Sequence, residues 1–221
     1  MPRPTAAHWP RFPADAVPSA GSWSARELMR IHLDVLFTRD ADGRLLRVNE
    51  PDGKEAPRFF LGRTREGNEW RFRADLPENL VEALEAACRD EPPGPELLAP
   101  PHEAQRYEAL LAASAPIRHR WAGPAYFFAR ALPAAAGPVP VTEANLDLLR
   151  PHLEDWCADV LLRQPAMMLL DQGRAVSLCC SGAVRRLARL PLYSTSWENA
   201  ASLALADRMG LECYGTDLHF T

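Results

Sequence analysis

The sequence lacks the features that mark several large classes of protein. It has 25 Lys and Arg residues against 29 Asp and Glu residues, so no basic excess indicates a nucleic-acid partner. Its longest apolar runs, Pro165–Leu170 and Val176–Cys180, are far shorter than the roughly 20 residues that span a bilayer. The N-terminus has no apolar segment typical of a secretory signal. We therefore expect a cytoplasmic protein with neither a nucleic-acid nor a membrane partner.

Metal-binding and disulfide patterns are also missing. The five cysteines are odd in number and form no C-x-x-C pair, which favours reduced thiols. None of the six histidines stands at ligand spacing from a cysteine or carboxylate, so we expect no metal site. No Gly-x-Ser-x-Gly elbow is present, which argues against a serine hydrolase.

The chain has enough apolar residues for a folded core, because 47% of its 221 residues are hydrophobic. Proline and small residues dominate residues 1–24, which we interpret as a flexible tail. A proline-containing segment near residue 138 then separates two regions. We expect a smaller α+β region over residues 25–138 and a C-terminal domain over residues 139–221.

Hydrophobic periodicity and turn residues predict the elements of both regions. In the first region, the clearest are strands at Phe59–Arg63 and Glu69–Arg73, helices at Glu78–Arg89 and His102–Ser114, and a strand at Ala125–Ala131. In the second, a hairpin joins the strands Ala166–Leu170 and Arg174–Ser181 through the turn Asp171-Gln172-Gly173. The elements that follow are a helix at Gly182–Leu190, a strand at Leu192–Ser196, a helix at Asn199–Met209 and a strand at Cys213–Phe220. This order predicts an α/β (α+β) fold with a mixed sheet flanked by helices.

One segment is more specific than the rest. Residues 191–202 read Pro-Leu-Tyr-Ser-Thr-Ser-Trp-Glu-Asn-Ala-Ala-Ser, and the following helix ends on Gly210-Leu211. This strand, asparagine and alanine-rich helix resemble the C-terminal signature of the GCN5-related N-acetyltransferase (GNAT) family, over roughly Val141–Thr221. The resemblance implies a mostly antiparallel GNAT-like sheet and transfer of an acetyl group from acetyl-CoA to an amine of a small molecule or peptide.

The same resemblance implies cofactor-binding roles for Asn199 and Ser196. The amide of Asn199 can both donate and accept hydrogen bonds, which suits the pantetheine arm of acetyl-CoA. Both residues are equally suited to capping the first turn of the following helix. The two roles are compatible, and both remain open at this stage.

Two parts of the family pattern are absent. No Arg/Gln-x-x-Gly-x-Gly/Ala loop is present to cradle the pyrophosphate of acetyl-CoA. In its place, Ser181 is joined to Pro191 by about ten residues, and we expect Arg174–Ser181 to pair directly with Leu192–Ser196. Ala206 stands where many family members carry a catalytic tyrosine, so no catalytic residue is assigned.

These departures leave three interpretations open. The chain is an acetyltransferase-like protein, a non-catalytic binding or interaction module derived from one, or a sequence that lacks residues present in the working protein. The oligomeric state is not predicted by any feature of the sequence.

Overall fold

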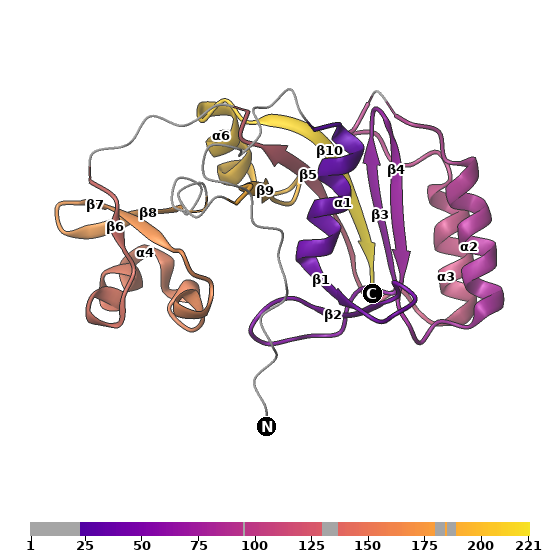
Figure 1. The fold of residues 1–221 in the computed structure, drawn as a ribbon, viewed down its shortest axis with the longest axis horizontal. Coiled ribbons are helices and arrows are strands. Elements are labelled where there is room, and N and C mark those ends of the chain that lie inside the picture. The colour runs from indigo at the N-terminus through magenta and orange to yellow at the C-terminus, as the bar shows by residue number, and fades with distance from the viewer. Residues whose placement is uncertain (1–22, 95, 130–136, 180–183, 185–188) are drawn as a thin grey trace. The chain divides into compact units, whose positions relative to one another are not determined.

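The computed structural model describes residues 23–94, 96–129, 137–179, 184 and 189–221 (Figure 1). These residues form two compact units. One contains the described residues between Arg130 and Pro191, and the other combines Ala20–Ala129 with Leu192–Thr221. The larger unit is therefore discontinuous in sequence, whereas we expected two consecutive regions that meet at residue 138.

The discontinuous unit is built on a five-stranded sheet. Its strands are β3 (Phe59–Thr64), β4 (Gly67–Phe72), β5 (Arg120–Phe127), β9 (Leu192–Ser194) and β10 (Glu212–Phe220). They lie in the order β4-β3-β10-β5-β9, and all neighbours are antiparallel. The last strand of the chain thus lies in the middle of a sheet whose other long strands come from the first half. The predicted α+β class with a mostly antiparallel sheet is confirmed.

Helices cover both faces of this sheet. Helices α2 (Glu78–Asp90) and α3 (Ala104–Ser114) pack on one face, and α1 (Ala25–Leu36) packs on the other. The two predicted helices in this region are confirmed to within a few residues. The short strands β1 (Phe37–Arg39) and β2 (Leu45–Val48) form a separate antiparallel pair.

The core under α2 and α3 is the largest apolar cluster in the described residues. Side chains from alternate positions of the central strands meet the apolar stripes of the two helices, as the period of two for strands and 3.6 for helices requires. Its fully buried members are Phe59, Leu61, Leu84, Ala87, Tyr107 and Leu111, and Leu218 and Phe220 of β10 complete it.

The second unit contains a small three-stranded sheet and short helical turns. The sheet order is β6 (Val139–Pro140), β7 (Met167–Asp171) and β8 (Arg174–Cys179). Between β6 and β7 lie the 3-10 helices η2 (Glu143–Leu149), η3 (Glu154–Trp156) and η4 (Val160–Leu162) and the single turn α4 (Arg150–Leu153).

The predicted hairpin in this unit is confirmed. Gln172 and Gly173 join β7 to β8, and both have positive φ values, 47° and 76°. Positive φ at both central residues is what a two-residue hairpin turn of type I′ needs, and glycine adopts it without steric cost. Strand β8 lies at the edge of this sheet, because β7 is its only partner among the described residues.

The expected pairing of Arg174–Ser181 with Leu192–Ser196 is wrong. Strand β8 belongs to the three-stranded sheet, whereas β9 pairs with β5, with Tyr193 opposite Tyr126. The aromatic pair explains the preference, since the two rings lie 6.1 Å apart between centroids and cross-strand aromatic contacts stabilise a pairing. The predicted helix at Gly182–Leu190 falls mostly outside the described residues, as do residues 1–22 of the predicted tail. No helix in the described part of the chain is long and apolar enough to cross a membrane.

The pairing of β5 with β9 generates a test of the fold. Phe127 and Leu192 are direct register partners, so the chain leaves and re-enters the larger unit at adjacent points. Replacing residues 130–191 by Asn-Gly should therefore leave a folded domain, in which Phe128, Ala129 and the two new residues form a four-residue hairpin loop. We expect the shortened protein to unfold in one cooperative urea transition and to keep the amide NMR shifts of β3, β4 and β10. A non-cooperative transition would show that this unit depends on the other for its structure.

Candidate functional site

The segment that carries the family resemblance forms a strand-to-helix junction at the edge of the large sheet. After β9 the chain continues alongside β5, where the backbone N–H of Trp197 donates to the carbonyl of Ala122 at 3.2 Å. Helix α6 (Ala200–Arg208) starts three residues later. Gly210, with a φ of 62°, lies just past its end, where a left-handed residue terminates a helix. The predicted strand and helix are both confirmed.

The structure shows Asn199 acting as the cap of α6 and Ser196 forming a local turn before the helix. The Oδ1 atom of Asn199 accepts a hydrogen bond from the backbone N–H of Ser202 at 3.0 Å, which makes Asn199 the N-cap of α6. The Oγ atom of Ser196 accepts from the backbone N–H of Glu198 at 3.1 Å. The capping interpretation is therefore confirmed for Asn199 but not for Ser196, because Glu198 precedes the first residue of α6. Within the described residues no hydrogen bond engages the NH2 group of Asn199, so that group can still donate to a ligand.

Gly123 holds this junction against the sheet, and sequence reasoning did not identify it. A side-chain carbon at this position would overlap the backbone carbonyl of Thr195. The chain between β9 and α6 can therefore lie this close to β5 only because residue 123 has no side chain. The strand context of Gly123 was the available signal, because glycine inside a strand often marks a close backbone approach.

A buried hydrogen-bond chain fastens the junction to the central strand. The indole Nε1–H of Trp197 donates to Thr216 Oγ1 at 3.1 Å, and the Thr216 hydroxyl donates to the Gly123 carbonyl at 2.8 Å. Thr216 is 5% exposed, so neither bond has to compete strongly with water. This one hydroxyl group therefore connects β10, β5 and the segment between β9 and α6.

Trp197 also lines a cavity within this unit. The cavity has a volume of about 160 Å³ and lies between the sheet and the segment that leads into α3. Its apolar wall comprises Leu97, Pro101, Ala104, Ala122, Trp197 and Leu218. Its lining is mostly apolar with a few polar groups, as in small-ligand pockets, but its volume is below the roughly 300–1,000 Å³ typical of them.

The charged side chains of the cavity wall occur in pairs. Arg63, whose side chain is 6% exposed, has its Nε atom 3.5 Å from Glu91 Oε1 and donates from Nη1 to the Ala99 carbonyl at 2.6 Å. Burial lowers the pKa of Arg63, and the charge of Glu91 acts in the opposite direction. Arg120 forms an ion pair with Glu108. The wall thus presents two guanidinium groups whose charges are already compensated.

The carboxylate of Glu91 also binds the backbone just before α3, next to the cavity. Its two carboxylate oxygens accept from the backbone N–H groups of His102 and Glu103, at 2.9 and 2.8 Å. These amides stand at the start of α3, where N–H groups lack partners inside the helix. One buried carboxylate therefore caps α3 and neutralises Arg63, which fixes the loop between α2 and α3 over the sheet.

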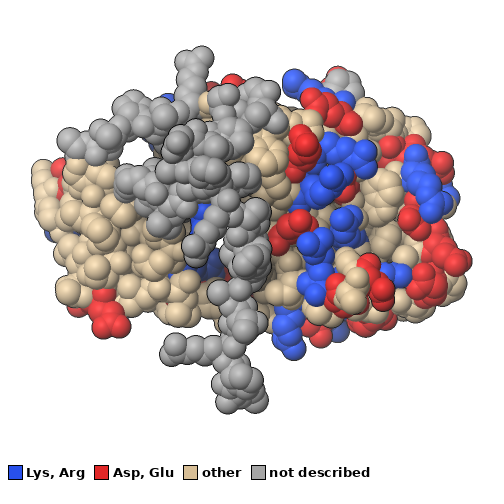
Figure 2. Space-filling model, viewed as in Figure 1, with Lys and Arg blue, Asp and Glu red and all other residues tan. Residues whose placement is uncertain are grey.

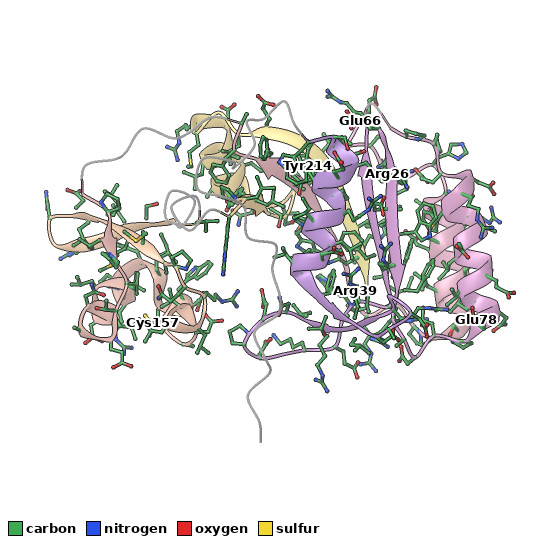
Figure 3. The ribbon with its side chains drawn as sticks, in the orientation of Figure 1. Arg26, Arg39, Glu66, Glu78, Cys157 and Tyr214 are labelled. Carbon is green, nitrogen blue, oxygen red and sulfur yellow. The ribbon has the colours of Figure 1, made fainter. Side chains whose placement is uncertain are left out.

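A polar network lies on the opposite face of the sheet, under α1. His32 Nε2 and His219 Nε2 both lie 3.2 Å from Asp217 Oδ2, and the Tyr214 hydroxyl lies 3.0 Å from His32 Nδ1. These three contacts form together when Tyr214 donates to His32 and both imidazoles donate to Asp217 Oδ2, whereas the buried Oδ1 atom of Asp217 has no hydrogen-bond partner in the described structure. Figure 3 shows Tyr214 beside α1. Burial raises the pKa of Asp217, but the hydrogen bonds from His219 and His32 outweigh it and lower the pKa to about 2.

The residues of this network are far apart in the sequence, so the sequence alone indicates only part of it. Asp217 and His219 stand two residues apart on one strand, which places both on the same face. His32 comes from a helix 185 residues away from Asp217, and no local pattern brings it there. We interpret the network as structural, because the side chains of His32 and Asp217 are 4% and 0% exposed.

The exposed arginines of this face are balanced as well. Figure 2 shows basic side chains interspersed with acidic ones over the part of the molecule that contains α1, β3 and β4. Arg26 and Arg30 both bind the carboxylate of Glu69, at 2.7 and 3.0 Å. No group of three or more potential metal ligands is found among the described residues.

The tyrosines near the signature do not supply a general acid here. Ala206, at the position of the family's tyrosine, is fully buried in α6. Tyr214 is 7% exposed and engaged with His32, and burial raises its pKa well above the ordinary value. Tyr193 lies against Tyr126 across the β5–β9 pair.

Comparisons with known proteins add little to this geometry. No protein-family model matches the chain. No curated protein matches it either. A structural match is a crystal structure assigned to the GNAT family of acetyltransferases, from Novosphingobium aromaticivorans DSM 12444, at 9% sequence identity and a TM-score of 0.36. The match covers 48% of this chain and 66% of the other, so this chain spans slightly less than two thirds of that protein. Likeness at this level assigns neither a family nor an activity.

The Asp217 network predicts how stability depends on pH. The pKa of Asp217 is depressed from 3.8 to about 2, so its contribution is complete above about pH 4 and is lost as pH falls through 2. In urea unfolding at pH 7, Asp217→Asn should lose on the order of 2 kcal/mol relative to the unchanged protein. The difference should shrink as the pH approaches 2. A difference that stays constant from pH 7 to pH 2 would exclude this origin.

The Thr216 hydroxyl predicts a second effect on stability. Thr216→Val keeps the shape but leaves the Trp197 N–H and the Gly123 carbonyl without their partner, which should cost about 1–3 kcal/mol. The matched control is Thr38→Val on β1, because the Thr38 side chain is exposed and water can replace the two hydrogen bonds that its hydroxyl makes with the backbone of Arg47, at 3.2 and 3.4 Å. Urea unfolding should show less than about 0.5 kcal/mol for this control. Equal losses in the two variants would contradict the role of Thr216.

Proposed function

We propose that this chain is a GNAT-type N-acetyltransferase-like protein that takes an acetyl group from acetyl-CoA and transfers it to an amine. The observation that carries the proposal is the strand-to-helix junction. Its strand, the N-cap asparagine Asn199, the alanine-rich helix α6 and the terminating Gly210 stand in the order that the sequence resemblance implies. In addition, Trp197 of the same segment lines a cavity.

The reaction needs few groups beyond correct placement. The neutral amine nitrogen attacks the thioester carbonyl carbon, the carbon–sulfur bond breaks, the thiolate of CoA leaves, and the nitrogen gives up a proton. In this proposal the NH2 group of Asn199 donates to a pantetheine carbonyl, and Ser196 flanks the arm. The acceptor is an amine of a small molecule or peptide, and the reaction takes place in the cytoplasm.

A second candidate is a non-catalytic module that keeps the fold but not the transfer reaction. Two observations favour it: the sequence has no glycine-rich loop for the pyrophosphate, and buried Ala206 stands in place of the family's tyrosine. The open strand edges fit loss of an intervening segment, because among the described residues β8 pairs only with β7 and β9 only with β5. The same edges would arise if the working protein contains residues that this sequence lacks.

Binding and turnover separate these candidates. A ligand of the native state at 100 times its Kd stabilises the protein by about 2.7 kcal/mol, so acetyl-CoA should raise the melting temperature in a dose-dependent way. The assay should then follow release of free CoA thiol in the presence of a panel of primary amines. Stabilisation with thiol release supports the transferase, and stabilisation without release supports the binding module. No thermal shift at millimolar acetyl-CoA would overturn the transferase and leave a non-catalytic interaction module.

Asn199 offers a matched pair of variants for the same assay. Asn199→Asp keeps the cap on α6 but removes the NH2 donor, whereas Asn199→Ala removes both. We expect Asn199→Asp to leave the free energy of unfolding within about 0.5 kcal/mol of the unchanged protein. It should nevertheless weaken acetyl-CoA binding as much as Asn199→Ala does. Normal acetyl-CoA affinity in Asn199→Asp would assign this residue to capping alone.

A further inference from the structure

His219 is surrounded by aromatic rings on the face of the sheet that α1 covers. Phe60 of β3 and Trp121 of β5 are its direct register partners on the two neighbouring strands, and their ring centroids lie 5.0 and 4.8 Å from that of the imidazole. Phe37 of β1 adds a third ring at 5.7 Å, inclined at 68°. Aromatic rings attract a cation within about 6 Å of their centroids, so these surroundings favour the protonated imidazole over the neutral one.

The carboxylate that binds His219 needs a positive charge nearby. The side chain of Asp217 is 0% exposed, its Oδ2 atom lies 3.2 Å from the Nε2 atoms of both His32 and His219, and its Oδ1 atom has no hydrogen-bond partner in the described structure. Burial acts to raise the pKa of Asp217, and the hydrogen bonds and charges that lower it come from these two imidazoles. A buried carboxylate is costly unless a cation compensates its charge. One imidazolium in this cluster would do so.

The contacts of the two imidazoles distinguish His219 from His32 as the carrier of that charge. The Nδ1 atom of His32 lies 3.0 Å from the Tyr214 hydroxyl, so a second proton on His32 would prevent Tyr214 from donating to it. His32 is also 4% exposed, whereas His219 is 19% exposed and can exchange a proton with water. The titratable groups of the cluster are His32 from α1 and Asp217, His219 and Tyr214 from β10, because β1, β3 and β5 contribute only uncharged rings.

We infer that this cluster is a pH-sensitive switch that controls how tightly α1 binds the sheet, in which His219 takes up a second proton and becomes the cation that neutralises Asp217. Helix α1 covers Asp217, and His32 of that helix is one of the two partners of the carboxylate. With the proton bound, the helix covers a neutral pair. Without it, the helix covers a net negative charge, and movement of α1 away from the sheet lets water hydrate the carboxylate. Helix α1 therefore opens more readily at pH 9 than at pH 6.

The sign of the effect on stability follows from proton binding. When the folded state binds a proton more tightly than the unfolded chain does, the free energy of unfolding falls as the pH rises through the range in which imidazoles lose protons. In urea unfolding, we expect the unfolding constant of the unchanged protein to rise at least tenfold more between pH 6 and pH 9 than that of His219→Gln. The amide of this variant can donate to Asp217 but carries no charge.

The matched control for this experiment is His119→Gln, because the His119 side chain is exposed and stands just before β5. It should keep the full pH dependence of the unchanged protein. The inference is overturned if His219→Gln keeps that dependence as well, or if His119→Gln loses it.

Hydrogen exchange, measured by mass spectrometry on the full-length protein, tests whether α1 is the element that is released. Helix α2 packs on the opposite face of the sheet and serves as the internal reference. We expect the protection of the α1 amides relative to those of α2 to fall at least tenfold between pH 6 and pH 9, and to change less than twofold in His219→Gln. An equal fall in both helices would mean that the whole unit opens, which would overturn the assignment to α1.

The charge on His219 can be observed without any substitution. Long-range 1H–15N spectra of the unchanged protein report how many ring nitrogens of each assigned histidine carry a proton. His219 should keep protons on both nitrogens at a pH at which the exposed His119 has already lost one. Loss of the His219 proton at a lower pH than that of His119 would overturn the inference, including the case in which the His219→Gln variant does not fold.

Discussion

The structure of the larger unit depends on one strand that has to be paired on both edges and covered on both faces. In β10, the residues from Tyr214 to Leu218 are all buried. A strand buried in this way cannot lie at the edge of a sheet, because its N–H and C=O groups would lose their partners away from water. Strands β3 and β5 supply those partners. The end of the chain is therefore required to complete a sheet begun by its first half.

The two faces of β10 are buried by different kinds of interaction. Leu218 and Phe220 join the apolar core under α2 and α3, where the stabilisation comes from removal of surface from water. Asp217 and His219 face α1, where a buried carboxylate is tolerated only because two imidazole groups bind it. The polar face gives little net stability per contact but specifies the position of α1, because a shifted helix would leave Asp217 unpaired.

Local elements of the fold could be predicted from the sequence because their determinants are local. The apolar stripe of α2 and the Gln172-Gly173 turn each lie within a few residues, and both were predicted correctly. The partner of β9 was not, since any strand with a free edge can accept it and the choice rests on contacts such as Tyr126 with Tyr193. The expected pairing of β8 with β9 rested on the tendency of consecutive elements to be neighbours in space. That tendency does not apply here, because a whole unit is inserted in the sequence between β5 and β9.

The candidate site shows the same limit. Asn199 could be identified because the residues around it form a motif, and its capping role followed from its place before a helix. The cavity could not be predicted, since its wall combines residues of β3, the segment before α3, β5 and positions 216–218 of β10. The charge of Arg63 in this wall is neutralised by Glu91, which comes from another element. The need for a glycine at position 123 follows only from the structure, in which Thr195 lies against it.

The absence of a glycine-rich phosphate loop from the sequence constrains how the proposed acetyl-CoA binding could work. A glycine-rich loop at a helix N-terminus supplies affinity through the phosphates, far from the reacting carbonyl. Without it, affinity in the proposed function has to come from the acyl-pantetheine end, where the proposal assigns the amide of Asn199. A neutral hydrogen bond contributes about 0.5–1.5 kcal/mol, so this contact alone corresponds to weak binding.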